Sequence, residues 1–413
     1  MLASDPLNSA SHADKDEIRA PITETGDSSH PDEELEHSDF NVLPIAGGST
    51  DLGVGGGFFA GLARVNKPGA DPFLWNIDSS GLITFKLDKQ GVSVPYVDIY
   101  ARLTVPRLFG APIRLELRPS YTSELIDYFG MGNAAPRRVF DPAQANHNKY
   151  QRGHPQFDVD LRTRLVDHLS LRVGFRYIYN AIRVPADSEL AEDQRAGSDE
   201  VKRLIGETAS HSVFLAKYGL AWDTRDQETS AHHGTFDTLD LKLSPGGTPA
   251  FPYRYGEATL NLRAFLSLGT PRVVLAVRVV GDCMFGQVPF YELARFDDTF
   301  ALGGTAGVRG IPAQRYYGKL KVLGNVELRL EALSFRAFGK PMTLAVVPLF
   351  DAGRLWADWH AQPELDGRGL GIKYGVGGGL RLQSGSAFVI RVDVVDAPVE
   401  PALGGYLAAG QMF

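Results

Sequence analysis

Hydrophobic and polar residues alternate with a period of two along most of this chain, from the 40s to the last residue. In 169–180 the apolar side chains fall on one face of an extended strand and the polar ones on the other, with Ile178 as the single exception. The same alternation recurs at 157–165, 260–267, 321–331 and 388–393. No stretch of comparable length repeats every 3.6 residues, so the pattern predicts an all-β chain with few helices.

Short and long connections alternate between the predicted strands. Short turns are predicted at 79–81, 106–110, 167–168, 269–271 and 383–385. Long polar loops are predicted at about 130–150, 184–208, 285–317 and 357–369. This order is typical of an antiparallel meander whose two ends face different environments.

The number of strands follows from these connections. Five strands are predicted after Gly318, at about 319–332, 342–355, 370–382, 386–396 and 404–413. Eleven are predicted before the 285–317 loop, the first starting near Thr50. That number requires the turn at 79–81, because a continuous Asp78–Leu87 strand would leave ten and would place the 285–317 loop at the short-turn end. The total of sixteen is even, as in bacterial outer-membrane barrels.

A membrane barrel explains this pattern better than a soluble sandwich, whose charged faces would point to water. A closed sheet of sixteen strands is too wide for side chains to fill, so its lumen holds water and charge while its apolar faces point to lipid. Tyr177, Tyr179, Trp222 and Trp356 fit interfacial aromatic belts. The predicted fold is therefore a 16-stranded antiparallel transmembrane β-barrel, in keeping with a hydrophobic content of 44% that is dispersed along the strands.

The formal charge of −7 is concentrated at the N-terminus. Residues 1–40 hold eleven acidic residues and only Lys15 and Arg19 as basic ones, which leaves a net charge of +2 on 41–413. The chain is accordingly divided into a disordered acidic segment at 1–40 and a barrel at 41–413. Met1 is followed by no basic region and no apolar region, so a signal peptide is not visible.

Several other classes of protein are disfavoured. The acidic net charge argues against nucleic-acid binding, and the single cysteine argues against a disulfide scaffold or a Cys-rich zinc site. The apolar runs are too short for a transmembrane helix. The glycine cluster 53–57 lacks the Lys-Ser/Thr of a phosphate loop, and His232, His233 and His360 have no metal-ligand spacing. No catalytic residue, metal or cofactor is predicted, and an outer-membrane esterase is a minor alternative because no Gly-x-Ser-x-Gly elbow is present.

Four segments resemble motifs of the BamA/TamA-type outer-membrane assembly and secretion superfamily, also called the bacterial surface antigen family. The 285–317 loop contains a sequence similar to the family's Val-Arg-Gly loop motif, although Ile311 replaces the aromatic residue that usually follows. The residues of that motif are Gly303, Gly304, Gly307, Val308, Arg309 and Gly310. Phe350, Asp351 and Gly353 resemble the Phe-x-Asp-x-Gly strand. Asp223, Arg225 and Asp226, with Gly234, resemble the Asp-Thr-Arg-Asp turn, and 128–133 resembles a further recurring segment.

The resemblance covers about 41–413 and implies a structural role for the loop. It implies that the loop folds back into the barrel and that Arg309 meets Asp351. A guanidinium group pairs bidentately with a carboxylate, and a partly dehydrated lumen strengthens the pair. The alternative is a purely structural pin without a functional cycle. The glycines of the motif would permit positive φ angles in a crowded lumen.

The resemblance also implies a lateral seam and an assembly signal. The small-residue-rich C-terminal strand 405–413 is expected to meet the first strand, 52–58, at a seam that opens in the family, with simple barrel curvature as the alternative. Phe413 is expected to be the C-terminal assembly signal. Family members carry periplasmic substrate-binding modules before the barrel, and forty residues are too few for one.

The function that the resemblance implies is protein insertion or translocation across the outer membrane through a loop-gated polar lumen. The expected partners are outer-membrane lipids, unfolded outer-membrane or secreted proteins, and the outer-membrane assembly machinery for the barrel's own insertion. A passive pore or a structural surface antigen is the alternative. Neither enzymatic activity nor nucleic-acid binding is expected.

Overall fold

The computed structural model describes residues 38–413 except 66–72, 89–90, 137–146, 297–298, 301, 338, 385–387 and 401–402. Disorder was predicted for 1–40, and residues 1–37 of this segment lie outside the described residues. The first strand begins at Ser38, three residues before the predicted start of the barrel.

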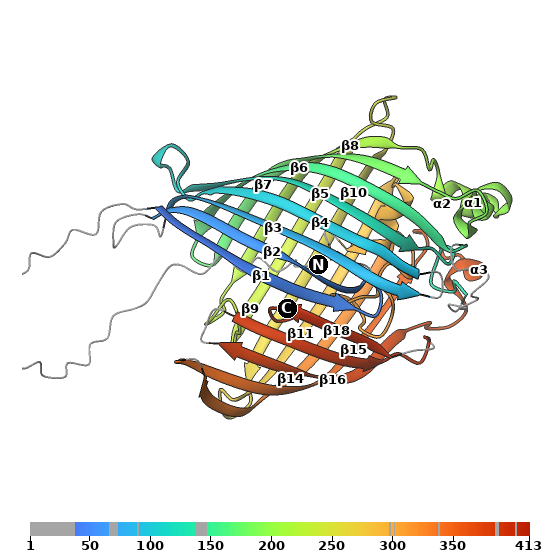
Figure 1. The fold of residues 1–413 in the computed structure, drawn as a ribbon. Coiled ribbons are helices and arrows are strands. Elements are labelled where there is room, and N and C mark those ends of the chain that lie inside the picture. The colour runs from blue at the N-terminus through green and yellow to red at the C-terminus, as the bar shows by residue number, and fades with distance from the viewer. Residues whose placement is uncertain are drawn as a thin grey trace, which may run out of the picture.

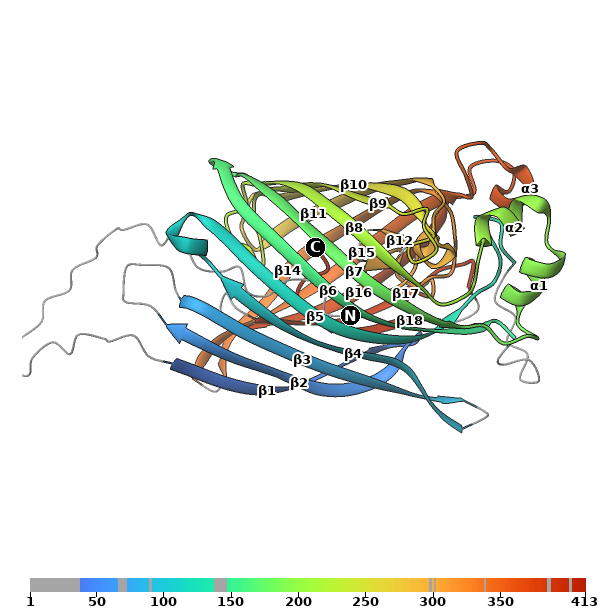
Figure 2. The same ribbon diagram turned by 90° about the horizontal axis from the view of Figure 1, so that it is seen from above.

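Sixteen antiparallel strands close into one barrel, which confirms the predicted fold class and strand number (Figures 1 and 2). Each strand pairs with its neighbours in sequence, and the barrel closes where β1 meets β18. The strands are β1 (Ser38–Ser49), β2 (Gly53–Val65), β3 (Phe73–Asp88), β4 (Gly91–Val105), β5 (Ile113–Asp127), β6 (Lys149–Val166), β7 (Leu169–Arg183), β8 (His211–Asp223), β9 (Gly234–Pro245), β10 (Arg254–Ser267), β11 (Val273–Gly286), β14 (Leu320–Ala337), β15 (Lys340–Trp356), β16 (Lys373–Ser384), β17 (Phe388–Asp396) and β18 (Gly404–Ala409).

The two ends of the barrel differ as the alternating connections predict. One end carries the long connections, with α1 (Glu189–Ala196), α2 (Asp199–Ile205) and α3 (Pro363–Asp366) beside one another in Figure 1. The other end carries the short turns, one of which contains η1 (Leu108–Gly110). The β11–β14 connection contains η3 (Phe290–Ala294) and a two-stranded sheet of β12 (Arg295–Phe296) and β13 (Thr299–Phe300). No helix in the described part of the chain is long and apolar enough to cross a membrane.

The faces of the strands are arranged inside out relative to a soluble protein. On β7, Phe175 and Tyr177 are exposed, whereas Arg176 and Asn180 are buried in the lumen. The exception in this strand, Ile178, is also buried, in an apolar cluster beneath the long connections. The period-two pattern of the sequence therefore assigned the lipid-facing and lumen-facing sides correctly.

The strand count is correct although two elements were predicted wrongly. The turn predicted at 79–81 is absent, because β3 runs continuously through it. The hydroxyl group of Ser79 bonds to the carbonyl oxygen of Tyr100 on β4, at 2.9 Å, and a Cβ at Gly81 would lie 2.7 Å from the ring of Phe58. Gly81 thus leaves room for a cross-strand aromatic ring and does not mark a turn. The count stays at sixteen because β1, which lies before Thr50, was not predicted. This missing strand offsets the extra one that came from splitting β3.

The seam between β1 and β18 is short. Among the described residues its register contains two pairs, Gly48 with Leu407 and Ser49 with Tyr406, whereas β1 pairs with β2 along its whole length. The predicted seam partner, 52–58, is wrong, because that segment lies in β2, between β1 and β3. β1 was missed because Pro44 and two glycines weaken its strand signal. A proline fits a strand with a largely free edge, since it cannot donate to a ladder.

Candidate functional site in the lumen

The β11–β14 connection folds back into the barrel and packs on its inner wall. Leu302, Val308 and Ile311 are fully buried and form one apolar cluster with Leu323 of β14 and Leu355 of β15. Ile311, which stands where the resemblance expects an aromatic residue, fills part of this cluster. The cluster holds the loop close to the wall, so the arginine between Val308 and Gly310 reaches the strands.

Arg309 is fully buried and pairs bidentately with Asp351 of β15. Its Nε lies 2.7 Å from Asp351 Oδ2 and its Nη2 lies 3.0 Å from Asp351 Oδ1. The backbone N–H of Arg309 also donates to Asp351 Oδ2, at 3.1 Å. The structure thus brings together the two residues that the motif resemblance pairs, in the geometry that a planar guanidinium group favours.

Two further carboxylates, which the sequence analysis did not single out, complete the surroundings of Arg309. Its Nη1 lies 2.7 Å from Glu327 Oε1 on β14 and 3.1 Å from Asp393 Oδ2 on β17. Burial alone would lower the pKa of Arg309, but Asp351 and Glu327 outweigh burial and hold that pKa well above its ordinary value. The guanidinium group therefore stays charged, although it lies out of contact with water.

Other arginines bind these carboxylates in turn. Arg381 Nη2 donates to Glu327 at 3.0 Å and Arg381 Nη1 to Asp393 at 2.5 Å. Arg329 Nε donates to the second oxygen of Glu327 at 3.1 Å. Because these pairs are buried and share partners, removing one charge leaves another uncompensated, which costs far more than losing a surface pair.

The loop backbone and the wall fit each other through glycines. Gly304 and Gly310 have positive φ angles, as predicted for the motif, but Gly303 and Gly307 do not. Gly303 is needed for another reason, because a Cβ there would lie 1.8 Å from the carbonyl oxygen of Pro312. On the wall, a Cβ at Gly375 of β16 would lie 2.1 Å from the carbonyl oxygen of Arg309. The glycine run of β16 therefore includes a position where the loop approaches the strand backbone.

The remaining residues of the two motifs have different surroundings. Gly307 accepts a hydrogen bond from the Asn325 side chain, at 3.0 Å, through its carbonyl oxygen. Gly353 faces the loop, since a Cβ there would lie 3.3 Å from Val308 Cγ2. Phe350 does not face the loop, because its side chain is 46% exposed on the outer face, where its ring stacks with Tyr374.

A second set of contacts holds the same connection to the opposite wall. Arg295 Nη2 lies 2.7 and 2.8 Å from the two carboxylate oxygens of Glu124 on β5. Gln314 donates to Glu124 Oε2 at 2.8 Å, and His154 Nε2 of β6 lies 3.0 Å from Glu124 Oε1. The connection is thus bound on both sides of the lumen. No motif marked Glu124, and its place in the polar phase of β5 was the only signal in the sequence.

The predicted Asp-Thr-Arg-Asp turn lies at the short-turn end, between β8 and β9. Arg225 pairs with Asp223 through Nε at 2.9 Å and Nη2 at 2.7 Å. Asp226 accepts hydrogen bonds from the backbone N–H groups of His232 and His233, and Gly234 takes a positive φ angle of 102°. The motif closes on itself as a turn and lies apart from the Arg309 network.

The segment 128–133 closes the opposite end of the barrel. Its Tyr128 is buried and donates to Asp193 of α1 at 2.7 Å, and the backbone N–H of Gly132 donates to the carbonyl oxygen of Tyr317 at 2.9 Å. This motif therefore holds the β5–β6, β7–β8 and β11–β14 connections together.

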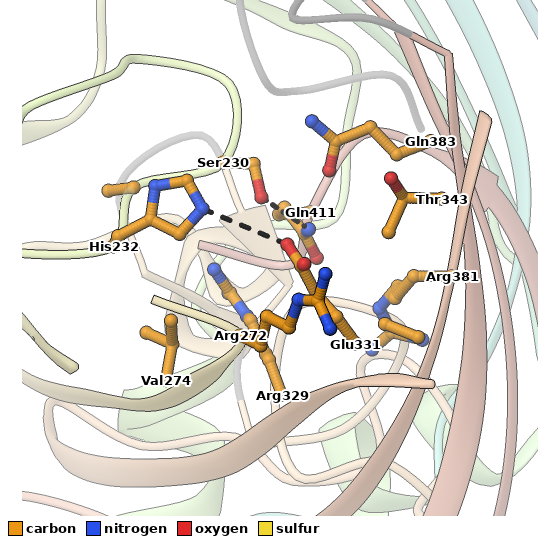
Figure 3. A pocket seen from close by; sticks show the side chains of 12 residues that line it. Ser230, His232, Arg272, Val274, Arg329, Glu331, Thr343, Arg381, Gln383 and Gln411 are labelled. Carbon is orange, nitrogen blue, oxygen red and sulfur yellow. Dashed lines mark hydrogen bonds and ion pairs between the residues drawn. The ribbon is translucent and has the colours of Figure 1, made fainter. Parts of the chain in front are cut away.

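The C-terminal residues turn into the lumen after β18 ends at Ala409. Phe413 lies against the ring of Phe265, with ring centres 6.4 Å apart, and its backbone oxygen accepts from Arg329 Nη2 at 2.9 Å. Gln411 donates to Ser230 at 3.3 Å beside a small pocket at the short-turn end (Figure 3). The role of Phe413 as an assembly signal stays a prediction.

The fold and this lumen define a transmembrane β-barrel with an internal arginine-bearing loop. The Omp85 superfamily domain matches residues 96–394, and the chain belongs to the Omp85 superfamily. This result confirms the resemblance found from the motifs. The comparison with curated proteins returned no match.

Solved structures share the fold at low sequence identity. BamA from Haemophilus ducreyi lacking POTRA domains 1–3 is 14% identical, with a TM-score of 0.61, over 91% of this chain and 70% of that chain. CdiB from Escherichia coli is 14% identical, with a TM-score of 0.54, over 90% of this chain and 62% of that chain. CdiB from Acinetobacter baumannii is 13% identical, with a TM-score of 0.51, over 91% and 60%. This chain thus spans less than two thirds of either CdiB chain.

Proposed function

We propose that this barrel acts in the insertion or translocation of proteins at the bacterial outer membrane, and that client strands enter at the β1–β18 seam. The short seam is the observation that carries the proposal. Within the described residues, β1 is paired on both sides only at Gly48 and Ser49. The rest of the strand, 38–47, pairs with β2 alone.

A largely free strand edge in a membrane barrel has a direct chemical consequence. Each backbone group without a hydrogen-bond partner in lipid costs several kcal/mol, so a spanning sheet normally closes along its whole length. An extended client strand can satisfy such groups by adding to the sheet edge. Phe40, Val42 and Leu43 of β1 are more than half exposed, so this edge also offers apolar side chains to a client or to lipid.

The β11–β14 connection, called the lumen loop from here on, has a separate role in the proposal. In its bound position it joins the β14–β17 wall through Arg309 and the β5–β6 wall through Arg295. Passage of a chain through the lumen would require these contacts to break. We propose that the loop keeps the lumen closed at rest and that its release belongs to the working cycle, which distinguishes this protein from a passive pore.

The membrane and the partners follow from the same features. The apolar side chains exposed on the outer face of the barrel suit the outer-membrane lipids. The largely free edge of β1 suits unfolded outer-membrane or secreted proteins. The barrel itself would need the outer-membrane assembly machinery for its own insertion. The proposal includes no covalent step, because inserting a strand exchanges hydrogen bonds and apolar contacts only.

A liposome assay tests the proposal. The full chain is reconstituted, an unfolded barrel client is added, and the rate of client folding is measured. A second arm closes the seam with a disulfide between Thr50→Cys and Gly405→Cys in a Cys283→Ser background. The two positions are neighbours across the seam, because the backbone N–H of Thr50 donates to the carbonyl oxygen of Gly405 at 3.1 Å and a Cβ at Gly405 would lie 3.7 Å from Thr50 Cγ2.

The two arms give distinct outcomes. The proposal expects faster client folding with the reduced protein than with empty liposomes, and loss of that acceleration after oxidation. Single-cysteine variants treated in the same way are the matched controls. A protein that never accelerates client folding would instead be a passive pore or a structural surface antigen.

A further inference from the structure

Three potential metal ligands converge at the long-loop end of the barrel, away from the lumen loop. His147 lies just before β6, and its Nε2 is 2.8 Å from Glu189 Oε2 at the start of α1. Glu192 follows Glu189 by three residues, so both carboxylates lie on one face of this helix. One ligand atom from each residue lies within 4.8 Å of the other two.

The orientation of the His147 ring is fixed by a backbone contact. Its Nδ1 lies 2.7 Å from the carbonyl oxygen of Asp187. A carbonyl oxygen has no proton to give, so Nδ1 carries the hydrogen and Nε2 is the nitrogen that faces the carboxylates. Metal-binding histidines typically have this arrangement, with the second ring nitrogen donating to a backbone carbonyl group.

The short distance between Nε2 and Glu189 calls for a proton or a cation between the two atoms. In neutral His147 the lone pair of Nε2 would face a carboxylate oxygen at 2.8 Å, which is repulsive. Either a second proton on the ring or a cation bound by both atoms removes the repulsion.

We propose that His147, Glu189 and Glu192 bind one divalent transition-metal ion of the zinc type, with water completing the coordination. Imidazole and carboxylate ligands suit this class of metal, and three protein ligands plus water form a common open zinc site. Tetrahedral ligation at about 2.1 Å would place Nε2 and the Glu189 oxygen roughly 3.4 Å apart. A small rotation of the Glu189 side chain from its present position achieves this separation.

The site would brace two long connections against each other. His147 belongs to the β5–β6 connection and the two glutamates belong to the β7–β8 connection. The backbone N–H of Glu189 already donates to the carbonyl oxygen of His147 at 2.7 Å, and Tyr128 donates to Asp193 nearby. A bound metal would add a further link between these connections. No sequence motif marks the site, because His147 lies more than forty residues before the two glutamates.

Zinc titration tests the proposal. The full-length, tag-free protein is stripped of metal in detergent, and Zn²⁺ binding is measured by calorimetry in the original protein and in His147→Ala, Glu192→Gln and His233→Ala. His233 is the matched control, because its side chain is 70% exposed at the opposite end of the barrel. Heat-modifiable gel migration checks that each variant retains a folded barrel.

The expected result is one saturable equivalent of Zn²⁺ that disappears in His147→Ala, weakens at least about tenfold in Glu192→Gln, and persists in His233→Ala. Zinc should also slow amide exchange in α1 of the original protein but not of His147→Ala. Equal binding by the original protein and His147→Ala, or no saturable binding at all, would overturn the proposal. His147 would then be a protonated partner of Glu189 only.

Discussion

Replacing Arg309 with alanine is expected to release the lumen loop while the barrel remains closed. The strands keep their ladder hydrogen bonds, because Arg309 belongs to the connection between β11 and β14. What changes is the balance of charge in the buried network. Arg309→Ala removes a cation that contacts Asp351, Glu327 and Asp393 together.

The size of the effect follows from the contacts that remain. Glu327 keeps Arg329 and Arg381, and Asp393 keeps Arg381. Asp351 keeps two hydrogen bonds, from the side-chain amide of Asn325 at 2.8 Å and from the backbone N–H of residue 309 at 3.1 Å, but it loses the guanidinium group that neutralises its charge. One buried carboxylate is thus left uncompensated, which costs about 3–5 kcal/mol. At the lower limit, the equilibrium between bound and released loop shifts by about a hundredfold.

Two further variants make the reasoning specific. Asp351→Asn leaves Arg309 paired with Glu327 and Asp393, so the expected loss is smaller, about 1.5–3 kcal/mol. The double variant Arg309→Ala with Asp351→Asn removes the isolated carboxylate. It is therefore expected to hold the loop better than Arg309→Ala alone.

Hydrogen exchange followed by mass spectrometry measures the effect directly in peptides covering 302–311. Protection should fall in Arg309→Ala, fall less in Asp351→Asn and recover partly in the double variant. Arg336→Ala removes one positive charge from an exposed position of β14 and serves as the control. Protection in Arg309→Ala equal to that of the control, or a double variant less protected than Arg309→Ala, would refute the reasoning.

Three other predictions test separate parts of the structure. Gly375→Ala places a Cβ 2.1 Å from a loop carbonyl oxygen and should lower loop protection, whereas Gly378→Ala, with its nearest atom at 3.7 Å, should not. Glu124→Gln weakens two hydrogen bonds from Arg295 and should lower the free energy that holds that side of the loop in place by about 1.5–3 kcal/mol. Faster amide exchange in peptides containing Arg295 would report this loss. Burial raises the pKa of Asp226, but hydrogen bonds from two backbone N–H groups outweigh it and lower that pKa overall. The stabilisation by Asp226 is therefore present above the unfolded-state pKa of about 3.9 and is lost as the pH falls through the lower folded-state pKa. The unfolding temperature of Asp226→Asn should accordingly fall less on acidification than that of the original protein.

The fold could be predicted from the sequence because its two signals need no knowledge of which distant residues meet. One signal lies within each strand, and the other is a rule for the barrel as a whole. Alternation is a property of each strand by itself, and it placed Phe175 outside and Arg176 inside. The even strand number is a constraint on the whole barrel, and it forced a total of sixteen even though β3 was split and β1 was missed. The constraint could not show which element was wrong, since an extra turn and a lost strand have the same effect on the count.

The site could be predicted only where a motif existed. Alternation placed Glu327 and Asp393 in polar phases, but it does not tell which inward side chains of different strands meet in the lumen. Asp351 shares its inward phase with Val347 and Leu349, so only the motif identified it. Glu124 and His147 had no motif, and each acquires its partners through folding of a connection far away in sequence.

Tyr406 links the lumen loop to the seam, so it allows a test of whether the two move together. Its hydroxyl oxygen accepts a hydrogen bond from the backbone N–H of Gly310, at 2.8 Å, and its backbone pairs with Ser49 across the seam. Tyr406→Phe leaves that N–H buried without its acceptor, at a cost of about 1–3 kcal/mol. If loop and seam are coupled, exchange should increase both at Gly310 and in β1.

The matched control for this variant is Tyr374→Phe, which removes a hydroxyl group from a ring exposed on the outer face. Faster exchange at Gly310 with unchanged exchange in β1 would show that the loop and the seam open independently. The working cycle would then need a second signal to open the seam. Increased exchange in both places would mean that releasing the loop from β18 is sufficient to loosen the edge where a client strand would add.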